Sequence, residues 1–283
     1  MLLERFRAAK RDELAALRAL EARGALPAPL AGSRPSFTAA LTAPGREPLA
    51  VIAEYKRASP SRGVICEDLE VEDVAAAYHA AGAAALSILT EQAHFHGNLD
   101  YLARAAAPAL YAGPRPPLLR KDFLCDPLQV RATAATPAAA LLLIVRLTPD
   151  VALLRGLREL AESCGLEAVV EVFDATDLRL ARESGARLIQ VNARDLETLC
   201  VNRQACLELI HAFPPQAGEV WIAASGLSRP EHLRAAADAG YTAALVGGAL
   251  MEGGKPGAAL RALLAPHVLP APGASGQGGE ACL

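Results

Sequence analysis

The sequence predicts an α/β protein with a (β/α)8 barrel fold and an N-terminal helical extension. From residue 49 onward, short apolar runs typical of buried strands alternate with Ala- and Leu-rich stretches that have helical spacing. Eight strand–helix units recur at intervals of roughly 20 to 35 residues. Glycines stand where the helices should end, at Gly82, Gly165, Gly185 and Gly240. A doubly wound open sheet is the alternative, but the chain has no glycine-rich dinucleotide loop.

The chain divides into three expected parts. Residues 1–48 form the extension, with one helix over 2–23 and a short helix within 33–41, where Phe37 and Leu41 could pin the segment to a core. Residues 49–265 form the barrel. Its strands are predicted to end near Glu54, Ser87, Lys121, Ile144, Glu171, Asn192, Ser225 and Gly247. Its helices are predicted over 71–81, 98–107, 126–135, 149–163, 174–184, 203–212, 228–239 and 255–264. Residues 266–283 are rich in Pro, Gly, Ser and Ala, which predicts a disordered tail.

Composition excludes several classes of function. The net charge of -3, with dispersed basic residues and 4% aromatic residues, argues against a nucleic-acid partner. No apolar run reaches the length of a membrane span, and the N-terminus lacks the apolar core of a signal peptide. The six cysteines contain no C-x-x-C pair, so we expect buried free thiols and no metal site. These features predict a cytoplasmic protein; we expect a monomer, with a weak dimer as the alternative.

The ends of the predicted strands carry acids and bases. Glu54 and Lys56 close the first apolar run and, two residues apart, project to the same face of an extended chain. A surface ion pair would give the same local pattern. Later strand ends, however, add Lys121 and Glu171, and in a barrel these ends converge. Two lysines and two glutamates in one place predict proton transfer. The other side chains at these ends are Ser87, Phe123, Asn192 and Arg194.

The seventh and eighth strand ends predict a phosphate site. Each has a small dipeptide before a helix, Ser225-Gly226 and Gly247-Gly248, whose backbone N–H groups suit an anion. Ordinary strand–helix turns would also explain these dipeptides. Basic and hydroxyl groups expected nearby, Lys56, Ser59 and Arg62, favour a phosphorylated small-molecule substrate.

Several motifs together carry a resemblance to a known family. They are I-A-E-Y-K-R-A-S-P-S-R-G, L-S-I-L-T-E with F-H-G, L-L-R-K-D-F, V-V-E-V, N-A-R-D-L-E-T and A-S-G-L. In this order and spacing they resemble indole-3-glycerol phosphate synthase over roughly residues 2–264. The resemblance implies a (β/α)8 barrel that closes the ring of 1-(2-carboxyphenylamino)-1-deoxyribulose 5-phosphate, with loss of carbon dioxide and water. It implies no metal or organic cofactor.

The resemblance also implies roles for single residues. Lys121 matches the general acid of ring closure, and Glu171 matches the carboxylate that moves a proton during dehydration. Lys56 matches a second lysine that binds the substrate carboxylate or protonates the leaving hydroxyl, while Glu54 orients and balances the lysines. Which lysine serves which step stays open. The implied supporting residues are Asn192, which fixes substrate hydroxyls or Glu171, Ser87 and Arg194 as substrate contacts, and Phe123 as an apolar wall. The implied phosphate pocket consists of Lys56, Ser59, Ser225, Gly226, Gly247 and Gly248.

The chain departs from the family pattern at three places. Ala224 stands where an acidic residue usually precedes Ser-Gly, Gly248 stands where a polar residue is common, and Arg146 follows an unusual fourth strand. The same fold also suits two other functions. A sugar-phosphate isomerase or epimerase needs only one acid–base pair, and a barrel that only binds ligand needs none. The full set of two lysines and two glutamates argues against both.

Overall fold

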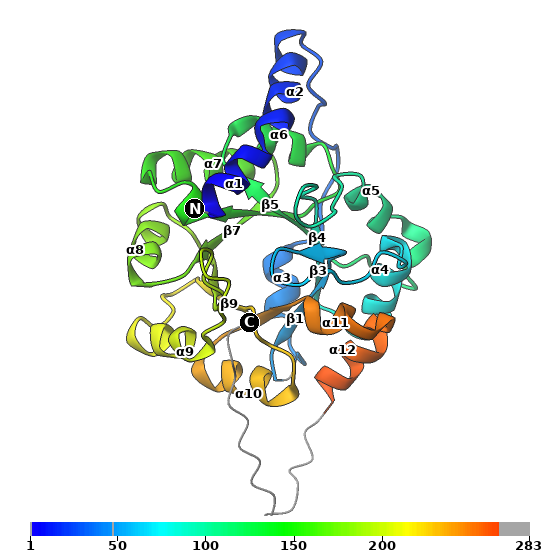
Figure 1. Cartoon of the computed structure of the whole chain (residues 1–283), viewed down its shortest axis with the longest axis vertical. Coiled ribbons are helices and arrows are strands. Elements are labelled where there is room, and N and C mark those ends of the chain that lie inside the picture. The colour runs from blue at the N-terminus through cyan, green and yellow to red at the C-terminus, as the bar shows by residue number, and fades with distance from the viewer. Residues whose placement is uncertain (1, 47, 266–283) are drawn as a thin grey trace, which may run out of the picture.

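A computed structural model describes residues 2–46 and 48–265, and its centre is a closed barrel of eight parallel strands (Figure 1). The strand β1 pairs with β10 on one side and with β4 on the other, which closes the sheet and excludes the open doubly wound alternative. The barrel strands are β1 (Ala50–Tyr55), β4 (Ala85–Leu89), β5 (Leu118–Leu124), β6 (Ala140–Ile144), β7 (Glu167–Val172), β8 (Leu188–Asn192), β9 (Val220–Ala224) and β10 (Ala243–Val246).

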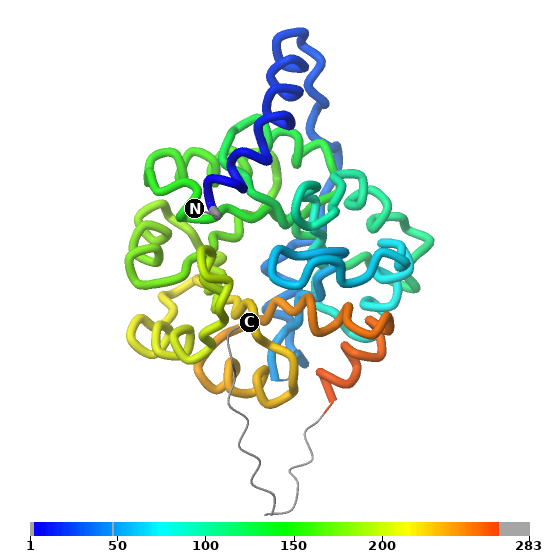
Figure 2. The backbone as a smooth tube through the Cα atoms, in the orientation of Figure 1, coloured from blue at the N-terminus to red at the C-terminus, as the bar shows by residue number. Residues whose placement is uncertain are grey.

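Helices cover the outside of the barrel, one after each strand (Figure 2). They are α4 (Val71–Ala80), α5 (Tyr101–Ala105), α6 (Pro127–Ala134), α7 (Val151–Ser163), α8 (Ala175–Glu183), α9 (Arg203–Ala212), α10 (Pro230–Ala239) and α12 (Pro256–Leu264). The predicted barrel helices and strand ends are confirmed to within three residues. The barrel loops also contain short elements: a small hairpin of β2 (Ala58–Ser59) and β3 (Gly63–Val64), the helix α11 (Gly248–Met251), and the 3-10 turns η1 (Pro108–Leu110), η2 (Val145–Leu147) and η3 (Glu252–Gly254).

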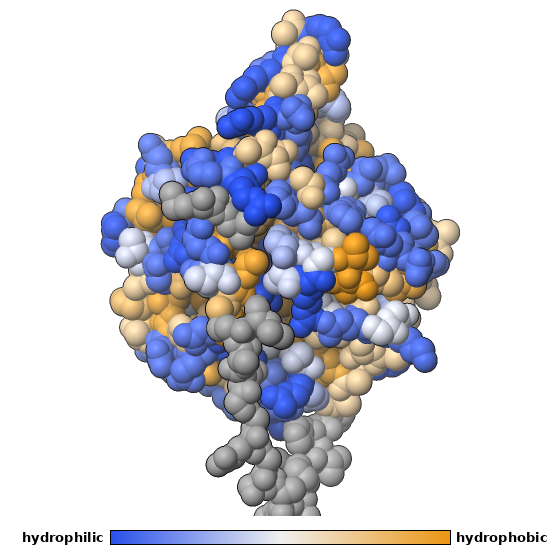
Figure 3. Space-filling model, in the orientation of Figure 1, coloured by the Kyte–Doolittle hydropathy of each residue, from blue (hydrophilic) through white to orange (hydrophobic). Residues whose placement is uncertain are grey.

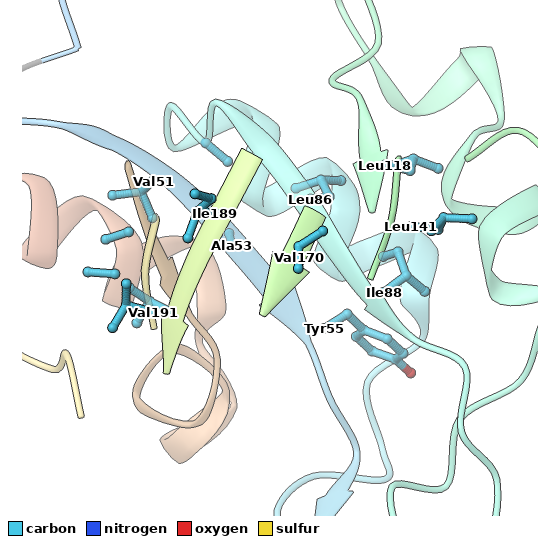
Figure 4. Close-up of a cluster of buried hydrophobic side chains, with 14 of the residues drawn as sticks. Val51, Ala53, Tyr55, Leu86, Ile88, Leu118, Leu141, Val170, Ile189 and Val191 are labelled. Atoms are coloured by element: carbon cyan, nitrogen blue, oxygen red, sulfur yellow. The ribbon is translucent and has the colours of Figure 1, made fainter. Parts of the chain in front are cut away.

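Alternation along each strand decides which side chains face the barrel interior. In β1 the residues Val51, Ala53 and Tyr55 belong to the large core between the strands and the outer helices (Figure 4). Ala50 and Ile52 belong to the smaller interior core. Because side chains alternate with a period of two, Glu54 continues the interior series at its upper end. The same alternation turns the polar ends of the other strands inward, where a barrel places its active site.

The N-terminal extension differs from the prediction of one continuous helix over 2–23. It forms two helices, α1 (Leu2–Ala9) and α2 (Arg11–Ala22), that join at Lys10. In Figures 1 and 2, α1 lies at the rim of the barrel near β5 and β7, and α2 projects away from the barrel. The physical reason is that the two helices pack on different partners. Phe6 of α1 packs into the interior core, whereas Leu17 of α2 packs against α6.

The short helix predicted within 33–41 is α3 (Phe37–Thr42), and it closes the bottom of the barrel. Phe37 and Leu41 are buried among residues at the start of the strands, such as Ala50 and Ala243. The Glu167 carboxylate, at the start of β7, accepts hydrogen bonds from the backbone N–H groups of Phe37 and Thr38. The barrel is therefore sealed below, and open space remains at the carboxyl ends of the strands.

The outer surface is mostly polar on the face that Figure 3 shows. Hydrophilic side chains cover most of this face, with smaller apolar patches between them. The five cysteines within the described residues are free. Cys206 alone among them is buried, so the expectation of buried thiols is wrong for the other four, which are half-buried. None of the described helices has the length and apolar character that crossing a membrane requires. The predicted tail lies outside the described residues.

Candidate active site

A cavity of about 570 Å³ lies at the carboxyl ends of the barrel strands. This volume is in the range of small-molecule sites. With the exception of Ser87, every predicted site residue lines it: Glu54, Lys56, Ser59, Lys121, Phe123, Glu171, Asn192, Arg194, Ser225, Gly226, Gly247 and Gly248. Side chains from all parts of the barrel sequence therefore meet in one place, as the strand-end argument predicts.

Glu54 and Lys56 form an ion pair at the wall of the cavity. The distance from Lys56 Nζ to Glu54 Oε1 is 2.9 Å, and the Glu54 side chain is only 5% exposed. Burial raises the pKa of Glu54, but the charges of Lys56 and Lys121, with hydrogen bonds from Lys56 and Ser87, outweigh it, so the pKa lies below its usual value. Glu54 is thus a fixed negative charge between two lysines.

Lys121 and Glu171 face each other across the barrel mouth. Lys121 Nζ lies 3.8 Å from Glu171 Oε2, and the Glu171 side chain is 1% exposed. The pairing of β5 with β6 shifts register between Arg120 and Leu124, an irregularity of the kind often found next to active sites. A partly exposed ammonium group beside a buried carboxylate can donate one proton while its partner accepts another.

Two predicted residues have other contacts than expected. Ser87 is buried and does not line the cavity, and its hydroxyl donates to Glu54 Oε2 at 3.3 Å, so it supports Glu54 rather than the substrate. Asn192 Oδ1 accepts the backbone N–H of Arg194 at 3.0 Å, and among the described residues no hydrogen bond joins Asn192 to Glu171. The Arg194 guanidinium in turn donates to the carbonyl of Leu199.

The predicted phosphate residues gather at one end of the cavity. Ser225 has a φ of 72° and Gly226 a φ of 73°, so the chain turns sharply after β9. A side chain at position 226 would also meet Val201 Cγ1 at 2.5 Å, which only glycine avoids. The guanidinium group of Arg203 donates to the carbonyl of Gly226 at 3.0 Å and adds a basic group that the sequence patterns did not indicate.

Gly247 leaves room for Glu54, and this gives a first prediction. A Cβ atom at position 247 would lie 3.0 Å from the Glu54 carboxyl carbon and closer still to Oε1. We expect Gly247→Ala to displace Glu54 from Lys56 and to lower kcat about tenfold or more, because small displacements of site groups are costly. Steady-state kinetics check this, with Gly156→Ala, in α7 with open space around it, as the control. Unchanged kcat would contradict it.

Two further lining residues escaped the sequence patterns. Phe6 of α1 stacks on Phe123 with ring centroids 4.0 Å apart, so the extension supplies part of the apolar wall. The helical spacing of apolar residues in 2–23 indicates that Phe6 is buried, but it does not indicate the residue on which Phe6 packs. Gln190 lies inward on β8 and donates to Glu171 Oε2. The sequence did carry a signal for Gln190, because it is a polar residue inside the apolar run L-I-Q-V-N and lies two positions before Asn192.

A buried ionic network attaches the extension to the strand that carries Lys121. Asp122 accepts hydrogen bonds from Thr90 Oγ1 at 2.6 Å and Arg120 Nη2 at 3.0 Å, and it forms an ion pair with Lys10. Glu13 pairs with Arg120 at 2.9 Å. Burial raises the pKa of Asp122. The charges of Arg120 and Lys10, with hydrogen bonds from Lys10 and Thr90, outweigh this effect, so the pKa of Asp122 lies below its usual value. Asp122 thus orients the groups around it through hydrogen bonds and ion pairs.

The fold and the cavity define a barrel enzyme whose lysines and glutamates are paired at the carboxyl ends of its strands. A family model described as indole-3-glycerol phosphate synthase matches residues 3–263. The chain belongs to the indole-3-glycerol phosphate synthase family.

Individual relatives agree with this assignment. An indole-3-glycerol phosphate synthase of Mycolicibacterium gilvum is 41% identical over 266 residues, which cover 93% of this chain and 92% of the relative. Another, from Carboxydothermus hydrogenoformans, is 41% identical over 215 residues, 76% of this chain and 79% of the relative. Among solved structures, a 3-hexulose-6-phosphate synthase has a TM-score of 0.60 at 16% identity, covering 76% of this chain and 98% of that one; this likeness shows the fold alone.

Proposed function

We propose that the cavity converts 1-(2-carboxyphenylamino)-1-deoxyribulose 5-phosphate to indole-3-glycerol phosphate. Family membership makes the protein a carbon–carbon lyase of the carboxy-lyase type in tryptophan biosynthesis. The observation that carries the residue-level proposal is the pairing of Lys121 with Glu171 and of Lys56 with Glu54 around one cavity. A sugar-phosphate isomerase or epimerase is not favoured, because the matching relatives carry the synthase name.

Lys121 is the proposed acid of ring closure. The aromatic carbon that bears the carboxylate attacks the ribulose carbonyl, and the carbonyl oxygen takes up a proton as the new carbon–carbon bond forms. The ammonium group of Lys121 is partly exposed to the cavity and is held near Glu171, which supports this role. Carbon dioxide then leaves and its bonding electrons restore the aromatic ring.

Dehydration follows in the same cavity. The new hydroxyl leaves as water after gaining a proton, and a proton leaves the five-membered ring to give the indole. We assign the proton-accepting role to Glu171 and the donating role to Lys56, which also binds the substrate carboxylate. Glu54 keeps Lys56 in place through the 2.9 Å ion pair, and Ser87 supports Glu54 from below.

The phosphate group is assigned to the end of the cavity formed by Ser59, Ser225, Gly226, Gly247 and Gly248. Small residues there let a ligand approach backbone N–H groups closely. Arg203 and Lys56 add positive charge. The apolar wall of Phe123 and Phe6 is assigned to the aromatic ring of the substrate, at the opposite side.

We further propose that the enzyme works as a monomer in the cytoplasm.

The direct test is indole formation, followed by fluorescence after mixing purified protein with the substrate. We expect signal growth from the wild type, and a fall in kcat of about 10²- to 10⁴-fold for Glu171→Gln, which cannot accept the proton. Glu162→Gln, an exposed partner of Arg158, is the matched control and should keep wild-type turnover. Absence of signal from folded wild-type protein would refute the proposal.

A further inference from the structure

Gln190 is a buried polar side chain that the proposed reaction leaves without a role. It lies on β8, two residues before Asn192 and on the same inward face. It lines the cavity although its exposed fraction is 0%. Burying an amide inside an apolar barrel costs free energy unless its polar atoms have hydrogen-bond partners, so a partner is expected for each end of this amide.

One end of the amide holds the proposed base. The strands β7 and β8 pair in a register that sets Glu171 opposite Gln190. Gln190 Nε2 donates a hydrogen bond to Glu171 Oε2, the oxygen that also lies 3.8 Å from Lys121 Nζ. An ionised carboxylate can only accept hydrogen bonds, so the charged Glu171 selects the nitrogen end of the amide. The carboxylate oxygen is thereby held between Lys121 and Gln190.

The other end of the amide is an unused acceptor. Gln190 Oε1 is buried and has no hydrogen-bond partner within residues 2–46 and 48–265. Two other side-chain atoms share this condition there, on Arg34 and Arg57, but neither residue lines the cavity. A buried acceptor without a donor is unfavourable, and a donor from a molecule in the cavity would relieve this.

We propose that Gln190 is a positioning residue for Glu171 and a contact for the sugar chain of the substrate. Its N–H group holds the carboxylate toward Lys121, and its Oε1 accepts a hydrogen bond from a hydroxyl or amine N–H of the bound substrate. Binding of that donor fixes the amide and, through it, the base. This inference rests on the proposed function.

The test is the near-isosteric change Gln190→Met, which removes donor and acceptor together. We expect kcat to fall about tenfold to a hundredfold, the range for loss of a hydrogen bond to a charged group. Loss of a donor to the carboxylate favours its protonated form, so the acidic limb of the pH profile of kcat should move to higher pH. The measurement is indole fluorescence across a pH series.

Two further variants separate positioning from simple stability. Gln129→Met changes an equally buried glutamine outside the cavity that bonds the backbone of Phe123 and Cys125. It should lower the unfolding temperature and leave the position of the acidic limb unchanged. Gln190→Glu keeps the shape but sets a second carboxylate beside Glu171, so it should also move the acidic limb to higher pH, even if the methionine variant does not fold.

The outcomes distinguish the two proposals. A folded wild type that forms no indole overturns the proposed function and this inference with it. An active wild type whose Gln190 variants keep its kcat and pH profile overturns the inference alone. A shift of the acidic limb shared by the Gln129 variant would also overturn it, because the effect would then follow stability.

Discussion

Replacing Lys121 by methionine is expected to lower kcat/KM about 10²- to 10⁴-fold, the usual contribution of a positioned acid. Methionine keeps an apolar stem of similar length but cannot give a proton to the carbonyl oxygen. The proposed phosphate site and the apolar wall do not include Lys121, so substrate should still bind. Indole fluorescence measures the rate, and titration calorimetry with the substrate measures binding.

The chain offers a matched control for this lysine. Lys255 is exposed before α12 and does not line the cavity, so Lys255→Met should leave both rate and binding unchanged. Turnover by Lys121→Met close to that of the wild type would remove Lys121 from the mechanism. Loss of binding together with turnover would assign it to substrate binding instead.

The second large effect concerns stability. Asp122→Asn removes the more deeply buried of the two carboxylates that Arg120 and Lys10 share, the other being Glu13, and breaking a buried ionic network in this way costs about 3–5 kcal/mol. We expect a corresponding fall in the free energy of unfolding, measured by urea denaturation at pH 7. The exposed cap Asp150 is the control, since asparagine caps α7 as well as aspartate does. A loss below about 1 kcal/mol at position 122 would contradict the expectation.

The stability difference between the wild type and Asp122→Asn is expected to depend on pH. The pKa of Asp122 is lowered by folding, so its contribution is fully present above the pKa of the unfolded chain, about 3.9. The contribution is lost as the pH falls through the lower pKa of the folded state. The difference in unfolding free energy between wild type and Asp122→Asn should therefore be constant near neutrality and shrink in acid. A constant difference down to pH 2 would show that the carboxylate is not the cause.

Strand ends were predictable because their signal is local. Polar residues such as Glu54 and Glu171 interrupt apolar runs, and two-residue alternation decides which face they share. Ser87 shows where this reasoning stops. Its strand continues to Leu89, which lines the cavity, so Ser87 lies one inward position too deep for substrate. Depth along a barrel depends on the stagger between neighbouring strands, which no single strand encodes.

Contacts between segments far apart in the chain could not be predicted from the sequence either. The helix pattern over 2–23 is continuous, and the break at Lys10 follows from the different partners on which α1 and α2 pack, the interior core and α6. The hydrogen bond from Gln190 to Glu171 likewise exists only once β7 and β8 lie in register. Propensity and periodicity describe each segment alone, whereas these features depend on the tertiary structure.

The anchoring of α1 has a consequence for synthesis on the ribosome. This helix is made before the strands on which it packs, so its contacts wait for Asp122 and for the carbonyl of Leu147, which accepts a hydrogen bond from Arg7 across 140 residues. At about 5–20 residues per second, that delay is on the order of 7–30 seconds. During this time Phe6 has no core to enter. Until half the barrel exists, the nascent chain therefore carries the apolar side chains of α1, such as Phe6 and Leu3, without the core on which they pack in the folded protein.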